Sequence, residues 1–207
     1  MLDTAARRLF APALEAAAAR IAAAGVSPLT VTVAGWLAGV AACGAAATGR
    51  WWLALVLWLL NRLLDGLDGP VARVRGATEL GGFLDIVADF SIYAGFVVAV
   101  AVARPEARLA CVALLCAYYL SGTAFLALSS LLERRGSTIG DARSLRFVGG
   151  LAEGAETVAV YVLFCVFPQW AAPIAWVFTA AVAVTAVQRV ILGVRVLRGP
   201  APSRSPR

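Results

Sequence analysis

The sequence is divided into apolar stretches that are each long enough to cross a lipid bilayer. Six of them follow one another, and short polar segments separate them, at residues 30–48, 51–72, 82–103, 108–131, 147–167 and 171–196. A transmembrane helix needs about 20 apolar residues, because the hydrocarbon core of a bilayer is about 30 Å thick. Backbone groups inside that core must be hydrogen-bonded within the protein, and a helix achieves this. We therefore expect an all-α, polytopic membrane bundle of six transmembrane helices.

The composition favours a membrane protein over a soluble one. Hydrophobic residues make up 61% of the 207 residues, charged residues only 14%, and the mean hydropathy is +0.84. A soluble domain is nearer half apolar and a quarter charged. The net charge of +6 comes from arginines, since the chain has no lysine, and most of them flank the expected spans. They indicate orientation and lipid headgroup contact, and we expect no nucleic-acid partner.

Both ends of the sequence differ from the apolar centre. Residues 1–26 are too polar to cross a membrane and predict an amphipathic helix on its surface, ending at Gly25. Ser27 and Pro28 then suit the N-cap and first residue of the next helix. The last nine letters, GPAPSRSPR, are typical of a disordered tail. The expected division is an interfacial helix (1–26), a six-span domain (27–198) and a tail (199–207).

The arginines predict the orientation. With six spans both termini lie on one side, and that side holds thirteen arginines against three on the other, Arg50, Arg104 and Arg108. The thirteen are Arg7, Arg8, Arg20, Arg73, Arg75, Arg134, Arg135, Arg143, Arg146, Arg195, Arg198, Arg204 and Arg207. Positive charge is enriched in cytoplasmic loops. We therefore expect a multi-pass protein of the cell membrane with both termini in the cytoplasm.

Four aspartates interrupt the apolar sequence where the second and third spans meet. The stretch LLDGLDGPVARVRGATELGGFLDIVADF places Asp65 and Asp68 three residues apart, and Asp85 and Asp89 four apart. Either spacing puts two side chains on one face of a helix. The two helices are consecutive and antiparallel, so all four carboxylates are expected at a similar depth near the cytoplasmic surface.

Buried carboxylates that converge repel one another unless cations neutralise them. The chain has no histidine, so any metal site should be oxygen-ligated, which suits Mg2+ or Mn2+. Two such ions form a clamp for phosphoryl transfer, and Gly66, Gly69 and Ala72 leave room for a large ligand. The alternative is that the acids only pair with nearby arginines, namely Arg62, Arg73 and Arg75.

The same stretch resembles the signature of the CDP-alcohol phosphotransferase (CDP-alcohol phosphatidyltransferase) family, D-x2-D-G-x2-A-R-x8-G-x3-D-x3-D. The matching positions here are Asp65, Asp68, Gly69, Ala72, Arg73, Gly81, Asp85 and Asp89. One departure is present, because seven residues rather than eight separate Arg73 from Gly81. The missing residue falls in the loop, so the helical spacing within each aspartate pair is kept.

The resemblance implies a homodimeric membrane enzyme of phospholipid synthesis. Such an enzyme displaces CMP from a CDP-linked donor, usually CDP-diacylglycerol (CDP-DAG), with an acceptor hydroxyl. It also implies that Asp65, Asp68 and Asp85 bind metal, and that Asp89 contributes to a second metal and acts as the base. The residues that would line the donor site are Gly66, Gly69, Ala72, Arg73 and Gly81.

Candidate acceptor residues lie further along the chain. Arg143 and Arg146, in the loop before the fifth span, suit a phosphate on the substrate, and lipid headgroup contact explains them equally well. Glu153 and Glu156 either face the acceptor or complement the N-terminus of the fifth span. Arg62, deeper than the aspartates, is expected to pair with them or to reach the polar cavity.

Two other functions are compatible with acids in a membrane. An intramembrane prenyltransferase also uses aspartates and magnesium, but its family patterns place Asn before Asp in longer chains, whereas Asn61 precedes Arg62 here. A divalent-cation transporter, which is not an enzyme, would need polar residues through the full depth of the membrane. The acids here gather at one end, which favours the phosphotransferase.

Overall fold

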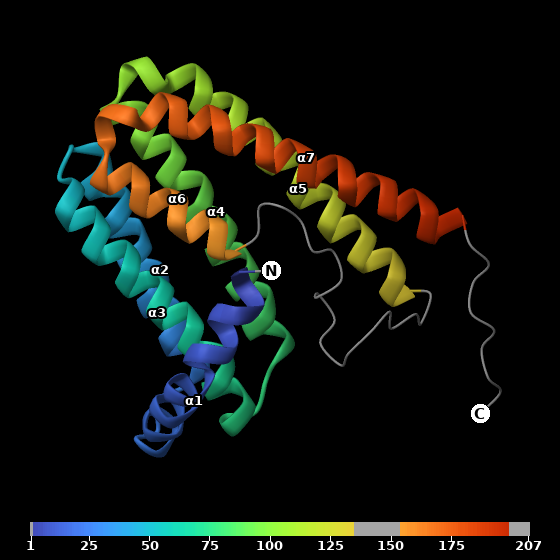
Figure 1. Ribbon diagram of the computed structural model, residues 1–207. Helices are drawn as coiled ribbons and strands as arrows, with labels where there is room; N and C mark the ends of the chain where they lie inside the picture. The colour runs from blue at the N-terminus through green and yellow to red at the C-terminus, as the bar shows by residue number, and fades with distance from the viewer. Residues whose placement is uncertain (1, 135–153, 199–207) are drawn as a thin grey trace.

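The computed structural model describes residues 2–134 and 154–198, and this part of the chain is helical with no strand. Figure 1 shows the order of the helices. They are α1 (Leu2–Ala23), α2 (Pro28–Ala47), α3 (Trp51–Arg75), α4 (Glu79–Ala103), α5 (Arg108–Arg134), α6 (Gly154–Val166) and α7 (Ala171–Arg198). Short 3-10 turns, Pro105–Ala107 and Pro168–Trp170, precede α5 and α7. The all-α expectation is confirmed.

The helix starts next to the aspartates are capped by side chains. Ser27 Oγ accepts a hydrogen bond from the Thr30 amide at 3.1 Å, and Pro28 is the first residue of α2, as the sequence predicts. Thr78 caps α4 in the same way, accepting from the Gly81 amide at 3.0 Å. Each cap satisfies an amide that the helix itself leaves without an acceptor. These caps fix where α2 and α4 begin, close to the acids.

Four of the described helical segments are long and apolar enough to cross a membrane, and the protein is a multi-pass membrane protein. They are Pro28–Ala47, Glu79–Ala103, Pro105–Arg134 and Pro168–Arg198. The other two expected spans, α3 and α6, are not among these four. α3 has 25 residues but carries the charges of the acidic stretch, and the described part of α6 has only 13 residues. The count of six spans therefore remains a prediction, as does the surface position of α1.

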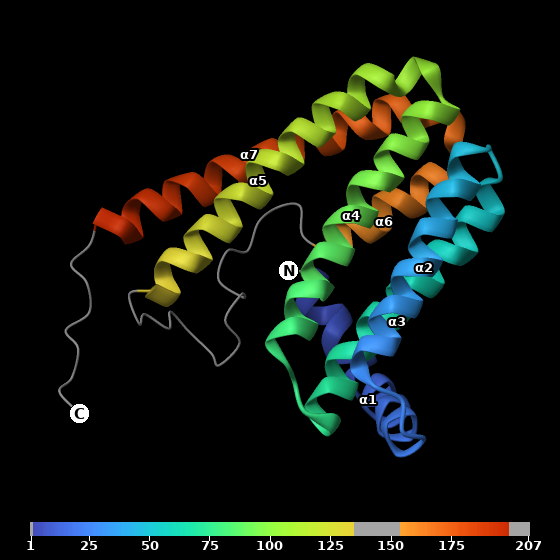
Figure 2. The same ribbon diagram turned by 180° about the vertical axis from the view of Figure 1, so that it is seen from behind.

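Small residues let α2 lie close to both helices that carry the acids. A Cβ atom on Gly35 would be 3.2 Å from Leu64 Cβ of α3, and one on Gly39 would be 2.8 Å from Ile92 Cγ1 of α4. The second distance is too short for a real side chain, so α2 and α4 approach closely because position 39 is a glycine. α2 therefore packs against α3 and α4 together and holds them side by side (Figure 2).

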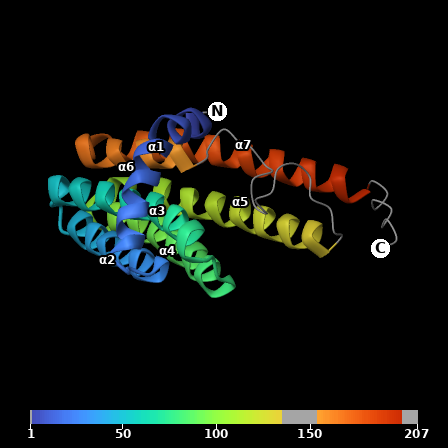
Figure 3. The same cartoon turned by 90° about the horizontal axis from the view of Figure 1, so that it is seen from below.

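The remaining helices surround this group unevenly. α5 and α7 lie side by side and extend away from α2 and α3 (Figures 1 and 2). α6 packs on α3, and an aromatic core of Trp58, Phe96, Tyr161 and Phe164 fills the space between α3, α4 and α6. α1 contacts α3 and α6 from one end, where it runs across α3 (Figure 3).

Candidate active site

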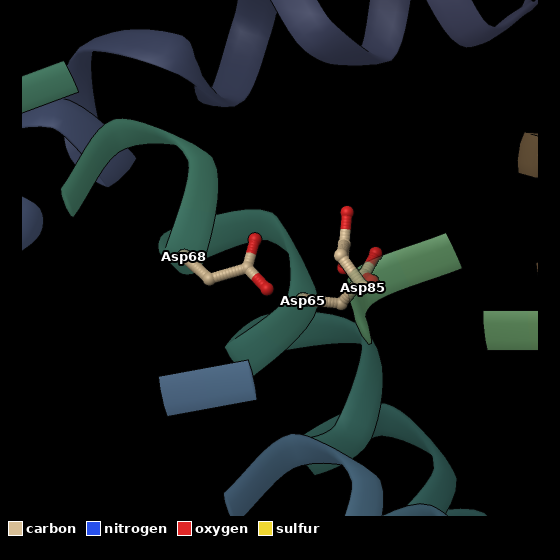
Figure 4. A group of neighbouring side chains, drawn as sticks. All are labelled: Asp65, Asp68 and Asp85. Carbon is tan, nitrogen blue, oxygen red and sulfur yellow. The ribbon is translucent and has the colours of Figure 1, made fainter. Parts of the chain in front are cut away.

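Three of the four aspartates form one acidic centre. One carboxylate oxygen from each of Asp65, Asp68 and Asp85 lies within 4.8 Å of the others. Figure 4 shows the three side chains turned towards a common point, two from α3 and one from α4. Asp68 is buried, and Asp65 and Asp85 are half-buried. The helical spacing of three residues brings the α3 pair onto one face, and the packing of α4 on the same helix α2 adds the third carboxylate.

A hydroxyl from a third helix holds one of these acids. Thr32 of α2 donates a hydrogen bond to Asp68 Oδ2 at 2.8 Å. A hydrogen bond to an ionised acceptor is stronger than one between neutral groups, so Thr32 fixes the direction of this carboxylate. The sequence analysis missed Thr32 because it lies outside the aspartate motif. The sequence feature that could have indicated Thr32 is its position in the first two turns of the helix that Ser27 caps.

The fourth aspartate, Asp89, is held by an arginine. Arg62 Nη2 lies 2.9 Å from Asp89 Oδ1, and Arg62 Nη1 lies 3.4 Å from Asp65 Oδ2. Arg62 therefore pairs with the acids, as the sequence allows. Asp89 still lines the same small cavity between α2, α3 and α4 as the other three aspartates.

The other two arginines considered as partners point elsewhere. Arg73 Nη2 lies 3.9 Å from Glu15 of α1, and Arg75 donates to the carbonyl oxygen of Ala22 at 3.2 Å. Within residues 2–134 and 154–198, neither Asp68 nor Asp85 has an arginine partner. Among the described residues, arginine pairing thus accounts for Asp65 and Asp89, and it does not account for the convergence of Asp68 and Asp85.

A larger cavity opens beside the acidic centre. Its volume is about 420 Å³, and Thr32, Asp68 and Asp85 form the wall shared with the acids. Three of the expected donor-site residues, Gly69, Ala72 and Gly81, also line it, together with Ser27, Pro28, Gly76 and Thr78. The cavity therefore lies between the ends of α2 and α4 and the C-terminal turns of α3.

Two expected donor-site residues do not line this cavity. A Cβ on Gly66 would lie 3.6 Å from Leu14 of α1, so this glycine faces α1 and makes room for that helix. Arg73 has an exposed side chain directed to Glu15, and its Nη1 is 3.9 Å from the Cβ position of Gly69. Arg73 therefore lies close to Gly69, which lines the cavity, whereas Gly66 lies where α1 packs on α3.

The candidate acceptor residues lie mostly outside the described part of the chain. This applies to Arg143, Arg146 and Glu153. Glu156 is half-buried in the first turn of α6, where an acidic side chain complements the helix N-terminus. Glu156 lines neither of the two cavities beside the aspartates.

Converging carboxylates beside a cavity, at one end of a helical membrane protein, suit a membrane-embedded transferase that acts on phosphate esters. Residues 25–188 match the sequence model of the CDP-alcohol phosphatidyltransferase family. The chain belongs to this family. It is a phosphatidyltransferase of phospholipid synthesis, and the prenyltransferase and transporter alternatives are set aside.

Two relatives and two solved structures are similar over most of the chain. Inner membrane protein YnjF of Escherichia coli (strain K12) is 42% identical over 180 residues, 84% of this chain and 86% of that protein. A phosphatidylinositol phosphate synthase of Mycobacteroides abscessus is 32% identical over 197 residues, 89% of this chain and 84% of that protein.

The solved structures are crystal structures of Mycobacterium tuberculosis phosphatidylinositol phosphate synthase. The form with CDP-DAG bound has a TM-score of 0.69 and 22% identity, covering 94% of this chain and 98% of that one. The complex with manganese and citrate gives the same TM-score and identity, and covers 94% and 92%. At this identity the likeness shows a shared fold.

Proposed function

We propose that the protein transfers the phosphatidyl group of CDP-DAG to the hydroxyl of an acceptor alcohol and releases CMP. The observation that carries this proposal is the cavity of about 420 Å³ that shares Asp68 and Asp85 with the acidic centre. Its position lets one ligand extend from the acids into a space lined by motif residues. CDP-DAG is the ligand bound in the structurally similar mycobacterial synthase.

The walls of this cavity suit a diphosphate and a nucleotide. The first residues of α2 and the N-terminal turn of α4 both border it, at Pro28 and Gly81. Helix N-termini favour anions, because their first amides point outward and the helix dipole is positive there. Gly69 and Ala72 keep the facing side of α3 free of bulky side chains, so a nucleotide fits against the backbone.

The acidic centre fits a divalent cation. Asp65, Asp68 and Asp85 offer only carboxylate oxygens, which are the ligands that Mg2+ and Mn2+ prefer. An ion held by these residues would supply positive charge to neutralise the diphosphate and would polarise a phosphoryl oxygen, which makes the phosphorus more electrophilic. The mycobacterial synthase crystallised with manganese supports this assignment. The two-ion arrangement predicted from the sequence needs Asp89 as a further ligand.

Asp89 is the carboxylate that we assign as the base on the acceptor hydroxyl. It lines the cavity that contains the other three aspartates, and the chain has no histidine that could serve instead. Its Oδ1 accepts from Arg62, and Oδ2 is the oxygen that we assign to the acceptor hydroxyl. Arg143, Arg146, Glu153 and Glu156 remain the predicted acceptor residues.

The proposed membrane arrangement follows the helix order. α2 to α7 are the six spans of residues 27–198, α1 lies on the cytoplasmic surface, and residues 199–207 form the tail. Both termini are then cytoplasmic in the cell membrane, and the active site opens to the cytoplasm. The enzyme is proposed to act as a homodimer. For the spans and the orientation, the support is the order of the helices, with α1 before α2 to α7, and the arginine distribution.

The proposal is tested by CMP release. Purified protein receives CDP-DAG and Mn2+ together with one acceptor at a time, including glycerol 3-phosphate, inositol, an inositol phosphate, serine and a lipid alcohol. We expect one acceptor to give CMP and the matching phospholipid, and Asp89→Asn to abolish turnover while CDP-DAG still binds. A folded protein that releases no CMP with any acceptor would contradict the proposal.

A further inference from the structure

Arg62 is an arginine enclosed by the helices that carry the acids. Its side chain is only 10% exposed, yet it lies within a helix that borders a membrane core. An arginine in such a place is rarely without a function, because its charge is costly to keep away from water. Nothing in the aspartate motif requires it, since the motif begins three residues later at Asp65.

The guanidinium of Arg62 is held by hydrogen bonds to neighbouring side chains and by two aromatic rings. Nε donates to Asn61 Oδ1 at 2.8 Å, and Nη1 donates to the Tyr93 hydroxyl at 2.7 Å. Nη2 donates to Asp89 Oδ1 at 2.9 Å. The plane also lies over two rings, 4.7 Å from the centroid of Trp58 and 5.0 Å from that of Tyr93. An arginine held in this way has one orientation, because its planar fork of donors is matched to fixed partners.

The partners of Arg62 are themselves anchored. Asn61 is 3% exposed, and its Nδ2 donates to the carbonyl oxygen of Gly35 at 2.9 Å, which ties it to α2. The backbone carbonyl of Tyr93 accepts from the Tyr161 hydroxyl of α6 at 2.6 Å. Asn61 therefore connects Arg62 to α2, and Tyr93 connects it to α6. Arg62 in turn holds one oxygen of Asp89.

We propose that Arg62 is a positioning residue for Asp89, an inference that rests on the proposed function. Its fork holds Oδ1 of Asp89, so that Oδ2 is presented to the acceptor in one orientation. A base fixed in this way meets the acceptor hydroxyl in a reactive geometry more often than one that rotates freely.

A simpler role for Arg62 would be charge neutralisation. A lysine would then replace it, because an ammonium supplies the same positive charge. A lysine cannot hold Asp89, Asn61 and Tyr93 together, since it lacks the planar fork and the stacking surface. The two roles therefore predict different outcomes for Arg62→Lys.

The kinetic test compares Arg62→Lys and Tyr93→Phe with the wild type in CMP release from CDP-DAG. We expect kcat of Arg62→Lys to fall about 10- to 100-fold with KM for CDP-DAG changed less than about threefold. Tyr93→Phe removes one acceptor from Arg62 and keeps the ring, so its kcat should fall by a smaller factor.

The matched control is Tyr118→Phe, which removes a hydroxyl that bonds Tyr161 and not Arg62, and should retain full activity. Wild-type kcat in Arg62→Lys, or equal kcat in both tyrosine variants, would overturn the proposal.

A second measurement does not depend on the reaction. The thermal unfolding midpoint of donor-free protein in detergent is compared for the wild type, Arg62→Lys, Asp89→Asn and the double variant. If Arg62 holds Asp89, the effects of the two single changes are not additive, because either change breaks the same contact. We therefore expect the double variant to unfold close to the less stable single variant. Additive shifts would overturn the role of Arg62, whereas absence of CMP release by the wild type would refute the proposed function.

Discussion

Thr32 and Arg62 show how much the centre depends on groups outside the motif. The hydroxyl of Thr32 directs Asp68 from α2, and the guanidinium of Arg62 directs Asp89 from within α3. The first contact links α2 to α3, and the second links α3 to α4. Two of the four aspartates are thus oriented by neighbours whose identity the motif does not specify.

The contact between Thr32 and Asp68 gives a prediction at this scale. Thr32→Val keeps the shape of the side chain and removes the donor, so Asp68 loses a hydrogen bond worth about 1.5–3 kcal/mol for an ionised acceptor. We expect Mn2+ to bind about tenfold more weakly, measured by titration of the donor-free protein. Thr48→Val is the control, because Thr48 bonds only carbonyl oxygens at the opposite end of α2. Equal affinity in Thr32→Val and the wild type would contradict the prediction.

The aspartates could be predicted from the sequence because their placement is local. Spacings of three and four residues determine which acids share a helix face, whatever the helix packs against. The caps at Ser27 and Thr78 are local as well. The positions of Gly66 and Arg73 were not predictable in this way, because they depend on α1 lying across α3, where Leu14 and Glu15 meet them.

Among the elements, α2 has the greatest influence on the site although it contributes no acid. Its glycines allow α3 and α4 to approach, and Gly35 also accepts the hydrogen bond from Asn61. Close packing through small residues is a common means of joining helices in membranes, where the lipid offers no hydrophobic driving force between them. The distance between the α3 and α4 carboxylates therefore depends on α2.

Enlarging Gly39 should disturb this arrangement. A Cβ at position 39 would lie 2.8 Å from Ile92 Cγ1, so Gly39→Ala forces α2 and α4 apart and destabilises the fold by about 1–3 kcal/mol. We expect a lower thermal unfolding midpoint and a lower kcat for CMP release. Gly44→Ala is the matched control, because no atom lies within 4 Å of its Cβ position on the same helix. The prediction fails if the two variants are equally stable.

For the whole molecule, the acids and the donor cavity lie at one end of the helical group, close to α1. The sequence predicts that this end is cytoplasmic, from the arginine count. It did not predict that α5 and α7 extend as a pair away from α2 and α3, because the apolar faces of membrane helices give little information on which neighbour they contact. Composition thus allows a prediction of span number and orientation, whereas it allows none of helix pairing.

The predicted orientation is tested by reporters fused to the C-terminus. With six spans and cytoplasmic termini, a green fluorescent protein fusion should fluoresce and an alkaline phosphatase fusion should be inactive in bacterial cells. An odd number of spans would give the opposite pair of results. A fusion of each reporter after Arg104, between α4 and α5, is the internal control and should give active phosphatase.

The central claim is that the three-carboxylate centre supports phosphatidyl transfer with a divalent cation. The most direct measurement is CMP release from CDP-DAG by the wild type and by Asp85→Asn, each with Mn2+ and after removal of metal by a chelator. We predict release only by the wild type with Mn2+, restored when the ion is added back, and none by Asp85→Asn although it folds. Release that persists without metal, or in Asp85→Asn, would contradict the account.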